Sequence, residues 1–131
     1  MALGVRERHR EGEKIPTRAR SSIQEKQVAK TVGGKQTANS GATPWQKGDI
    51  LTDGSYESSW LIECKTKMTS SKSITIQKEW FEKNKYEASE MGKANTAIVF
   101  NFGPNEENHY IIDEYLFKSL QEYLKQKEEK I

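Results

Sequence analysis

The chain of 131 residues is 34% hydrophobic and 31% charged, and its net charge is +2. This length suits one domain, and the low apolar fraction predicts that part of the chain is a solvated arm. No apolar run approaches the about 20 residues of a membrane helix, and no secretory signal pattern is present at the N-terminus. A single cysteine, Cys64, excludes an intramolecular disulfide and a zinc site built from several cysteines. We therefore expect a cytoplasmic protein without membrane contact.

Positive charge is concentrated in the first 20 residues, which contain six basic and three acidic side chains. Such a segment can bind a phosphate backbone by charge neutralisation, or it can be a solubilising tail. We expect residues 1–20 to form a flexible basic arm and residues 21–131 to form the folded domain. The arginines of this arm that are candidates for DNA contact are Arg6, Arg8, Arg10, Arg18 and Arg20.

The first helix is predicted to begin at a capping serine, Ser21 or Ser22, and to end at Gly33. A polar segment and a glycine- and proline-containing loop follow. Asp49–Thr52 and Trp60–Cys64 are apolar runs separated by turn-forming residues. This pattern predicts a β-hairpin.

The second half of the chain alternates between helical and extended patterns. Residues 75–91 are predicted to be a helix, residues 94–102 a buried strand, and residues 109–113 a further strand. From Glu114 onward, leucines at helical spacing predict a last helix, followed by a solvated run over residues 125–130. This order predicts an α/β domain with a central mixed β-sheet of about five strands flanked by helices.

The aromatic residues are interpreted mainly as packing residues. Trp60 and Trp80 are expected in the core. A further four are expected to pack the last helix on the sheet or to form a subunit contact: Tyr110, Tyr115, Phe117 and Tyr123.

The segment Glu63-Cys64-Lys65 and the preceding Asp49 carry the strongest chemical signal. On an extended strand Glu63 and Lys65 project from one face and Cys64 from the other. If the hairpin pairs as expected, Asp49 approaches Glu63 from the neighbouring strand. Two converging carboxylates repel each other unless a cation neutralises them, and a hard divalent cation does so. With Lys65 holding a phosphate oxygen or orienting water, the set favours phosphodiester hydrolysis. The alternative is a set of cross-strand ion pairs on a surface sheet.

These residues resemble the PD-(D/E)xK nuclease superfamily, and within it the archaeal-type Holliday-junction resolvases, relatives of which occur in phages. The resemblance spans about residues 21–102 and implies a restriction-endonuclease-like core. It implies that Glu25, Asp49, Glu63 and the backbone carbonyl of Cys64 bind the metal, and that Lys65 assists the nucleophilic water. For Glu25 the alternative is a capping box that serves the start of the first helix.

Several further residues are candidates for DNA contact. The resemblance implies that Ser40 lies beside a DNA phosphate near the site, and that Gln77 lies near the metal. For Gln77 a helix-capping or surface role is the alternative. Trp45 precedes Asp49 in a loop where it could stack on a base or sugar. Gly48 stands where the family has proline, and glycine also permits the turn. Lysines that would bind phosphates follow the Glu-x-Lys segment: Lys67, Lys72 and Lys78.

The expected activity is that of a magnesium-dependent endodeoxyribonuclease, with manganese able to substitute, acting on four-way junctions or other branched DNA. A homodimer is expected because two strands require two active sites. The resemblance places such a protein at the nucleoid or in a phage-infected cell. The alternatives are a restriction-like or nicking endonuclease on duplex DNA, a non-catalytic DNA-binding module, and a basic structural protein with chance carboxylates.

Overall fold

The structure is a computed structural model that describes residues 17–37 and 49–130, with the side chains of residues 17–22 excepted. Some of the candidates named above therefore lie outside the described residues: Arg6, Arg8, Arg10, Ser40, Trp45 and Gly48. Arg18 and Arg20 are described only as part of a helical backbone.

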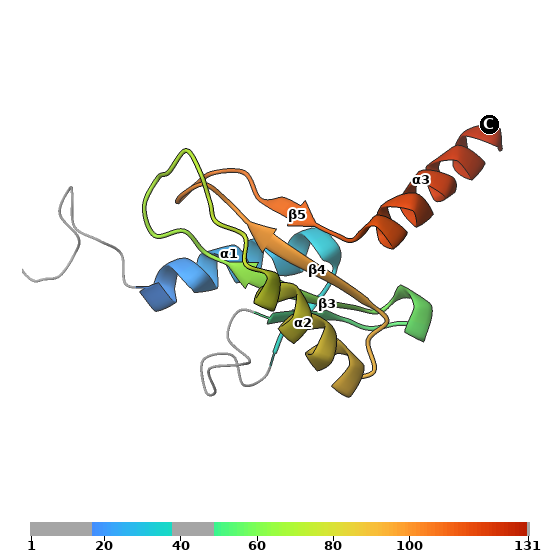
Figure 1. The fold of residues 1–131 in the computed structure, drawn as a ribbon, viewed down its shortest axis with the longest axis horizontal. Coiled ribbons are helices and arrows are strands. Elements are labelled where there is room, and N and C mark those ends of the chain that lie inside the picture. Colours follow the sequence, from blue (N-terminus) through green and yellow to red (C-terminus); the bar gives the residue numbers. More distant parts are fainter. Residues whose placement is uncertain (1–16, 38–48, 131) are drawn as a thin grey trace, which may run out of the picture.

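The described chain forms a five-stranded mixed sheet and three α-helices, which confirms the expected α/β fold (Figure 1). The strands lie in sequence order, with β3 and β4 parallel and the other neighbours antiparallel. The elements are α1 (Thr17–Val32), β1 (Lys35–Gln36), β2 (Asp49–Thr52), a short 3-10 helix (Tyr56–Ser58), β3 (Trp60–Lys65), α2 (Lys78–Glu90), β4 (Asn95–Phe100), β5 (His109–Ile111) and α3 (Glu114–Glu129).

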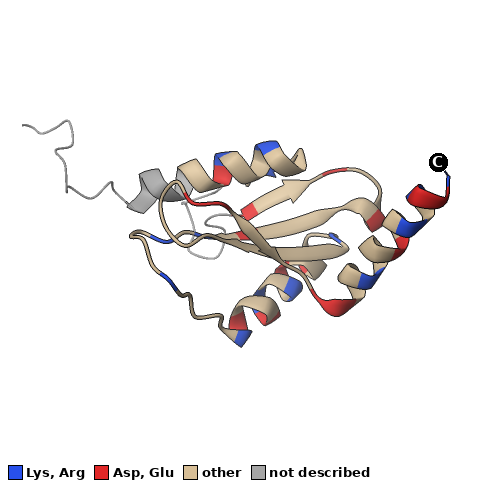
Figure 2. Cartoon of the chain, turned by 90° about the horizontal axis from the view of Figure 1, so that it is seen from above, with Lys and Arg blue, Asp and Glu red and all other residues tan. Residues whose placement is uncertain are grey.

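Helices α1 and α2 cover opposite faces of the sheet (Figure 2). The buried core on the α1 face consists of Val28, Ile50, Ile62, Ala97 and Val99. On the other face, the buried Asn84 of α2 donates a hydrogen bond to the carbonyl of Ala97, at 3.2 Å. Side chains that alternate along β2 and β3 are therefore divided between an apolar core on the α1 side and a second layer beneath α2.

Helix α1 begins at Thr17, four residues before the expected start. The predicted serine caps were wrong, because Thr17–Arg20 contains good helix formers that continue the helix upstream. Glu25 consequently lies in the helix interior, which excludes its interpretation as a capping-box residue. The predicted end was right: Gly33 adopts a φ of 70°, and the Gly34 amide donates to the Ala29 carbonyl.

The hairpin and the two later strands match their predictions within a few residues, whereas the two-residue β1 was not predicted. Helix α2 begins at Lys78, three residues later than expected. Helix α3 continues to Glu129, so the run over residues 125–130 is solvated as expected but mostly helical.

Of the two roles expected for the aromatic residues near the C-terminus, packing on the sheet does not hold for most side chains of α3, and a subunit contact remains a prediction. Within the described helix only Leu116 is buried, whereas Tyr115, Phe117 and Tyr123 are 77%, 59% and 59% exposed. No described helix is long and apolar enough to cross a membrane. A cytoplasmic location remains a prediction.

Candidate metal centre

The β2–β3 hairpin brings Asp49 and Glu63 together, as expected. The two residues are directly opposite in the antiparallel register, and both are buried. Because Ile50 and Ile62 belong to the core beneath α1, the carboxylates of Asp49 and Glu63 face α2.

Helix α2 supplies a third carboxylate, Glu87. Oxygen atoms of Asp49, Glu63 and Glu87 all lie within 4.8 Å of one another. The sequence analysis missed Glu87, although a signal was present. Glu87 follows Trp80 by seven residues, and residues seven apart lie on the same face of a helix. A glutamate on the buried face of an amphipathic helix is a candidate ligand.

Lys65 lies at the edge of this cluster. Its Nζ is 2.6 Å from Glu63 Oε2 and 4.5 Å from the centre of the Trp80 ring. Trp80 is half-buried and contacts the site lysine, and it is not one of the residues packed against the α1-side core. Trp60, in contrast, is half-buried against the core, as expected. The ammonium of Lys65 is thus held between a carboxylate and an aromatic face.

The local electrostatics disfavour three ionised carboxylates without a cation. The pKa of Asp49 is raised to about 8, first by burial and then by the negative charges of Glu63 and Glu87, against the opposing charge of Lys83. The pKa of Glu87 is also raised, chiefly by burial.

The unpaired oxygens of the cluster fit a metal ion. Glu63 Oε1 and Glu87 Oε1 are buried and have no hydrogen-bond partner among the described residues. Two such oxygens beside a third carboxylate are costly unless a cation or water binds them. An oxygen-only ligand set suits Mg²⁺ or Mn²⁺. The buried cluster could therefore hold a metal ion, as the sequence analysis expected, with Glu87 as an added ligand.

Glu25 is buried in α1 but is not one of the three clustered carboxylates. Its Oε1 accepts a hydrogen bond from Gln36 Nε2 at 2.8 Å, and Gln36 pairs with Ile50, whose side chain is in the α1-side core. Among the charges that raise the pKa of Asp49, Glu25 contributes least. Its predicted role as a ligand remains a prediction.

Cys64 projects toward the α1 side, as the alternation predicted, and burial raises the pKa of its thiol. Its side chain is therefore separated from the carboxylate cluster by the sheet. The predicted use of its backbone carbonyl as a ligand is untested.

The candidate DNA-contacting residues after β3 lie in and just beyond the connection to α2. Lys72, Gln77 and Lys78 are exposed and Lys67 is half-buried. Gln77 occupies the N-cap position of α2, but its side chain makes no capping hydrogen bond. Its position at the helix end and its exposure agree with the expected helix-capping or surface role, although the cap is made without its side chain. DNA contact by these residues remains a prediction.

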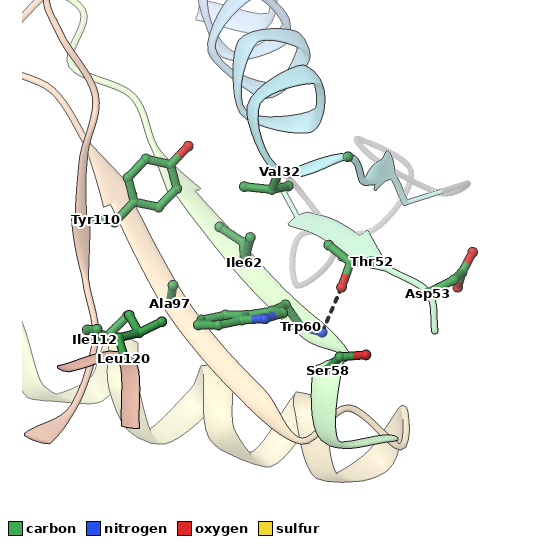
Figure 3. A pocket seen from close by; sticks show the side chains of 11 residues that line it. Val32, Thr52, Asp53, Ser58, Trp60, Ile62, Ala97, Tyr110, Ile112 and Leu120 are labelled. Atoms are coloured by element: carbon green, nitrogen blue, oxygen red, sulfur yellow. Dashed lines mark hydrogen bonds between the residues drawn. The ribbon is translucent and has the colours of Figure 1, made fainter. Parts of the chain in front are cut away.

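A cavity of about 440 Å³ lies away from the carboxylate cluster, beside α3 (Figure 3). Apolar side chains of Trp60, Ile62, Ile112 and Leu120 line it together with Tyr110. This cavity belongs to the α1 side of the sheet, since Ile62 and Trp60 pack on that side. It is therefore a separate feature from the candidate metal centre.

Comparison of the chain with protein-family models, with curated proteins and with solved structures found no match.

Proposed function

We propose that the protein is a metal-dependent endodeoxyribonuclease of the PD-(D/E)xK type that hydrolyses phosphodiester bonds in branched DNA. The observation that carries this proposal is the convergence of Asp49, Glu63 and Glu87, with Lys65 against the same cluster. Glu63 forms an ion pair with Lys65 through Oε2, but Glu63 Oε1 and Glu87 Oε1 are buried without a hydrogen-bond partner among the described residues, which an ion-pair network alone does not explain.

The proposed roles follow from the chemistry of each group. Asp49, Glu63 and Glu87 would hold Mg²⁺ or Mn²⁺. A bound divalent cation lowers the pKa of a coordinated water and stabilises the negative charge that develops on a phosphate. Lys65 contacts Glu63 through Oε2, which leaves Oε1 for the cation. The ammonium of Lys65 can then hold a phosphate oxygen or orient the attacking water.

Support for a DNA substrate comes from basic residues elsewhere in the chain. Lys67, Lys72 and Lys78 follow Lys65 in the chain, and the first 20 residues have a positive excess. Contacts from such side chains to phosphates position nucleic acid without reading its sequence. The preference for four-way junctions and the homodimeric state rest on the resemblance of the Asp49 and Glu63-x-Lys65 pattern to the resolvases.

The decisive experiment compares cleavage of a labelled immobile four-way junction with cleavage of a linear duplex of the same sequence. The full chain is assayed with magnesium, with manganese and with chelator, beside Asp49→Asn. The matched control is Glu90→Gln, because Glu90 is exposed on the same helix as Glu87. We expect paired cuts in the junction alone, a loss of about 100-fold or more in Asp49→Asn, and no change in the control.

The other outcomes separate the alternatives. Equal cutting of junction and duplex would retain the nuclease and exclude junction specificity, in favour of a restriction-like or nicking enzyme. Tight DNA binding without cutting under either metal would contradict the proposal and favour a non-catalytic binding module.

A further inference from the structure

Helix α3 carries an apolar stripe that its own domain leaves uncovered. Residues spaced three or four apart lie on one helix face, and here they are Leu116, Phe117, Leu120, Tyr123 and Leu124. Leu116 is buried, whereas the other four are 59%, 45%, 59% and 62% exposed, in that order. Figure 1 shows α3 extending away from the sheet beyond β5. Most of the stripe therefore faces solvent in a single copy of the chain.

The stripe is continuous with the apolar cavity on the α1 side of the sheet. Leu120 lines that cavity, and so do Ile112, which precedes α3, and Tyr110, which is 39% exposed (Figure 3). The helix stripe and the cavity together form one apolar surface, hereafter called the α3 surface. Contiguous apolar surfaces of this kind mark interaction sites.

We infer that the α3 surface binds a second copy of this chain, with the two α3 helices antiparallel and a two-fold axis near Leu120. This inference assigns an interface to the homodimer of the proposed function and rests on it in that respect, but neither the interface nor its tests involve the metal centre. Leu116 and Leu124 lie four residues to either side of Leu120, and Phe117 and Tyr123 lie three residues to either side. An antiparallel pairing therefore places apolar side chains opposite apolar side chains along the stripe.

The charges at the ends of the stripe favour the antiparallel direction. Asp113 and Lys127 lie seven residues before and after Leu120, so both are close to the line of the stripe. Asp113 remains 43% exposed although Lys85 contacts it, and Lys127 is exposed. In an antiparallel pair each Asp113 meets the partner's Lys127, whereas a parallel pair brings like charges together.

The available area is sufficient for a dimer. A fully exposed aromatic side chain offers about 200 Å² and leucine somewhat less. The exposed parts of the stripe and of Tyr110 then amount to about 500 Å² per copy, or about 1,000 Å² over two copies, which is the lower bound for a specific interface. The cavity beside Leu120 offers further apolar surface to the partner's Tyr123.

The first test measures the mass of the full chain by sedimentation equilibrium over a range of concentrations up to about 100 μM. We expect twice the chain mass of 15.0 kDa. Leu124→Glu should raise the dissociation constant at least about 10-fold, and Lys127→Glu should raise it several-fold. Lys125→Glu is the matched control, because Lys125 lies on the opposite helix face and its replacement should leave association unchanged. Since all three side chains are exposed, none of these changes should unfold the domain.

A monomeric wild-type chain would overturn the inference. Equal weakening by Lys125→Glu and Lys127→Glu would also overturn it, because a general charge effect would then explain both results.

The second test examines the direction of pairing by oxidative cross-linking. Leu120→Cys lies at the axis and should form a covalent dimer, whereas two copies of Leu124→Cys are roughly 12 Å apart along antiparallel helices and should not. The wild-type chain, whose single cysteine is Cys64, shows how much cross-linking occurs through Cys64 itself. Equal cross-linking of both variants would indicate parallel helices and contradict the proposed interface, as would failure of Leu120→Cys to cross-link.

Discussion

Glu87 is the residue that changes two converging carboxylates into a cluster able to surround a cation. Its Oε1 is buried and has no hydrogen-bond partner among the described residues, so this oxygen is available to a bound cation. We expect Glu87→Gln to weaken binding of Mn²⁺ by about 10-fold or more. Titration calorimetry of the full chain measures this effect without any substrate. The exposed Glu90→Gln should bind as the wild type does, and equal weakening in both variants would exclude a specific role for Glu87.

Asp49 makes the stability of the metal-free protein depend on pH. Its pKa is raised from 3.8 to about 8, so the folded protein retains a proton that the unfolded chain has lost. The unfolded state then binds fewer protons, and the free energy of unfolding falls as the pH rises from about 4 to about 8. Because one pKa unit corresponds to about 1.4 kcal/mol, a loss of a few kcal/mol is expected.

Urea unfolding with chelator at pH 5.5 and pH 8 tests this dependence. Asp49→Asn should flatten it, because the amide does not titrate, and a divalent cation should restore stability at pH 8 in the wild type. A wild-type protein that loses no more stability than Asp49→Asn over this interval would contradict the raised pKa.

Trp80 holds the ammonium of Lys65 through its aromatic face, at 4.5 Å from the ring centre. Such a contact is worth about 1 kcal/mol in a partly buried site, which corresponds to about a 5-fold effect on rate. If the proposed nuclease activity is present, Trp80→Leu should lower kcat by about this factor with little change in KM. Trp80→Phe should retain most of the rate, since an aromatic face remains. The exposed Tyr86→Leu on the same helix is the control. A Phe variant as slow as the Leu variant would indicate a packing role alone.

At the scale of elements, the hairpin register is what places the acids. Asp49 pairs with Glu63, and a slip of one residue would turn one of the two carboxylates to the opposite face of the sheet. This part of the site could be predicted because a turn between two apolar runs sets the pairing locally. The carboxylate that α2 contributes could not be predicted in this way, because the angle at which a helix packs on a sheet depends on side chains from several elements.

The start of α3 depends on one capping residue, Asp113. Its Oδ1 accepts a hydrogen bond from the Leu116 amide at 2.9 Å, and this bond is the main reason that the pKa of Asp113 is lowered. We expect Asp113→Ala to reduce the free energy of unfolding by about 1 kcal/mol and Asp113→Asn to retain most of it. Because the pKa is lowered on folding, the advantage of Asp over Asn should be present above about pH 4 and disappear as the pH falls through the pKa of the folded state. Thermal unfolding in dilute protein measures the difference. Equal loss in the Ala and Asn variants would show that the charge of Asp113, rather than the capping hydrogen bond, stabilises the start of α3.

At the scale of the whole molecule, the distribution of charge predicts a salt dependence of DNA binding. Each phosphate neutralised by a basic side chain contributes about 0.9 to the slope of log K against log salt concentration. Replacing Arg6, Arg8 and Arg10 by alanine should therefore make the slope shallower by up to about 3. Filter binding over a range of salt concentrations measures the slope. Alanine at Lys118 and Lys125 of α3 and at Lys130, which follows it, is the control, and an equal change in both triple variants would contradict a specific role of the arm.

The sequence by itself determined the order of the main elements, the hairpin, and the pairing of Asp49 with Glu63. These features follow from apolar periodicity and turn residues, which act over a few neighbouring positions. The tertiary structure alone decided that Glu87 joins the two acids, that Trp80 contacts Lys65, and that Glu25 is not one of the clustered carboxylates. It also decided that α3 leaves its apolar stripe exposed. These outcomes depend on how α1, α2 and α3 are placed around the sheet, and that placement results from packing between residues far apart in the chain rather than from local pattern.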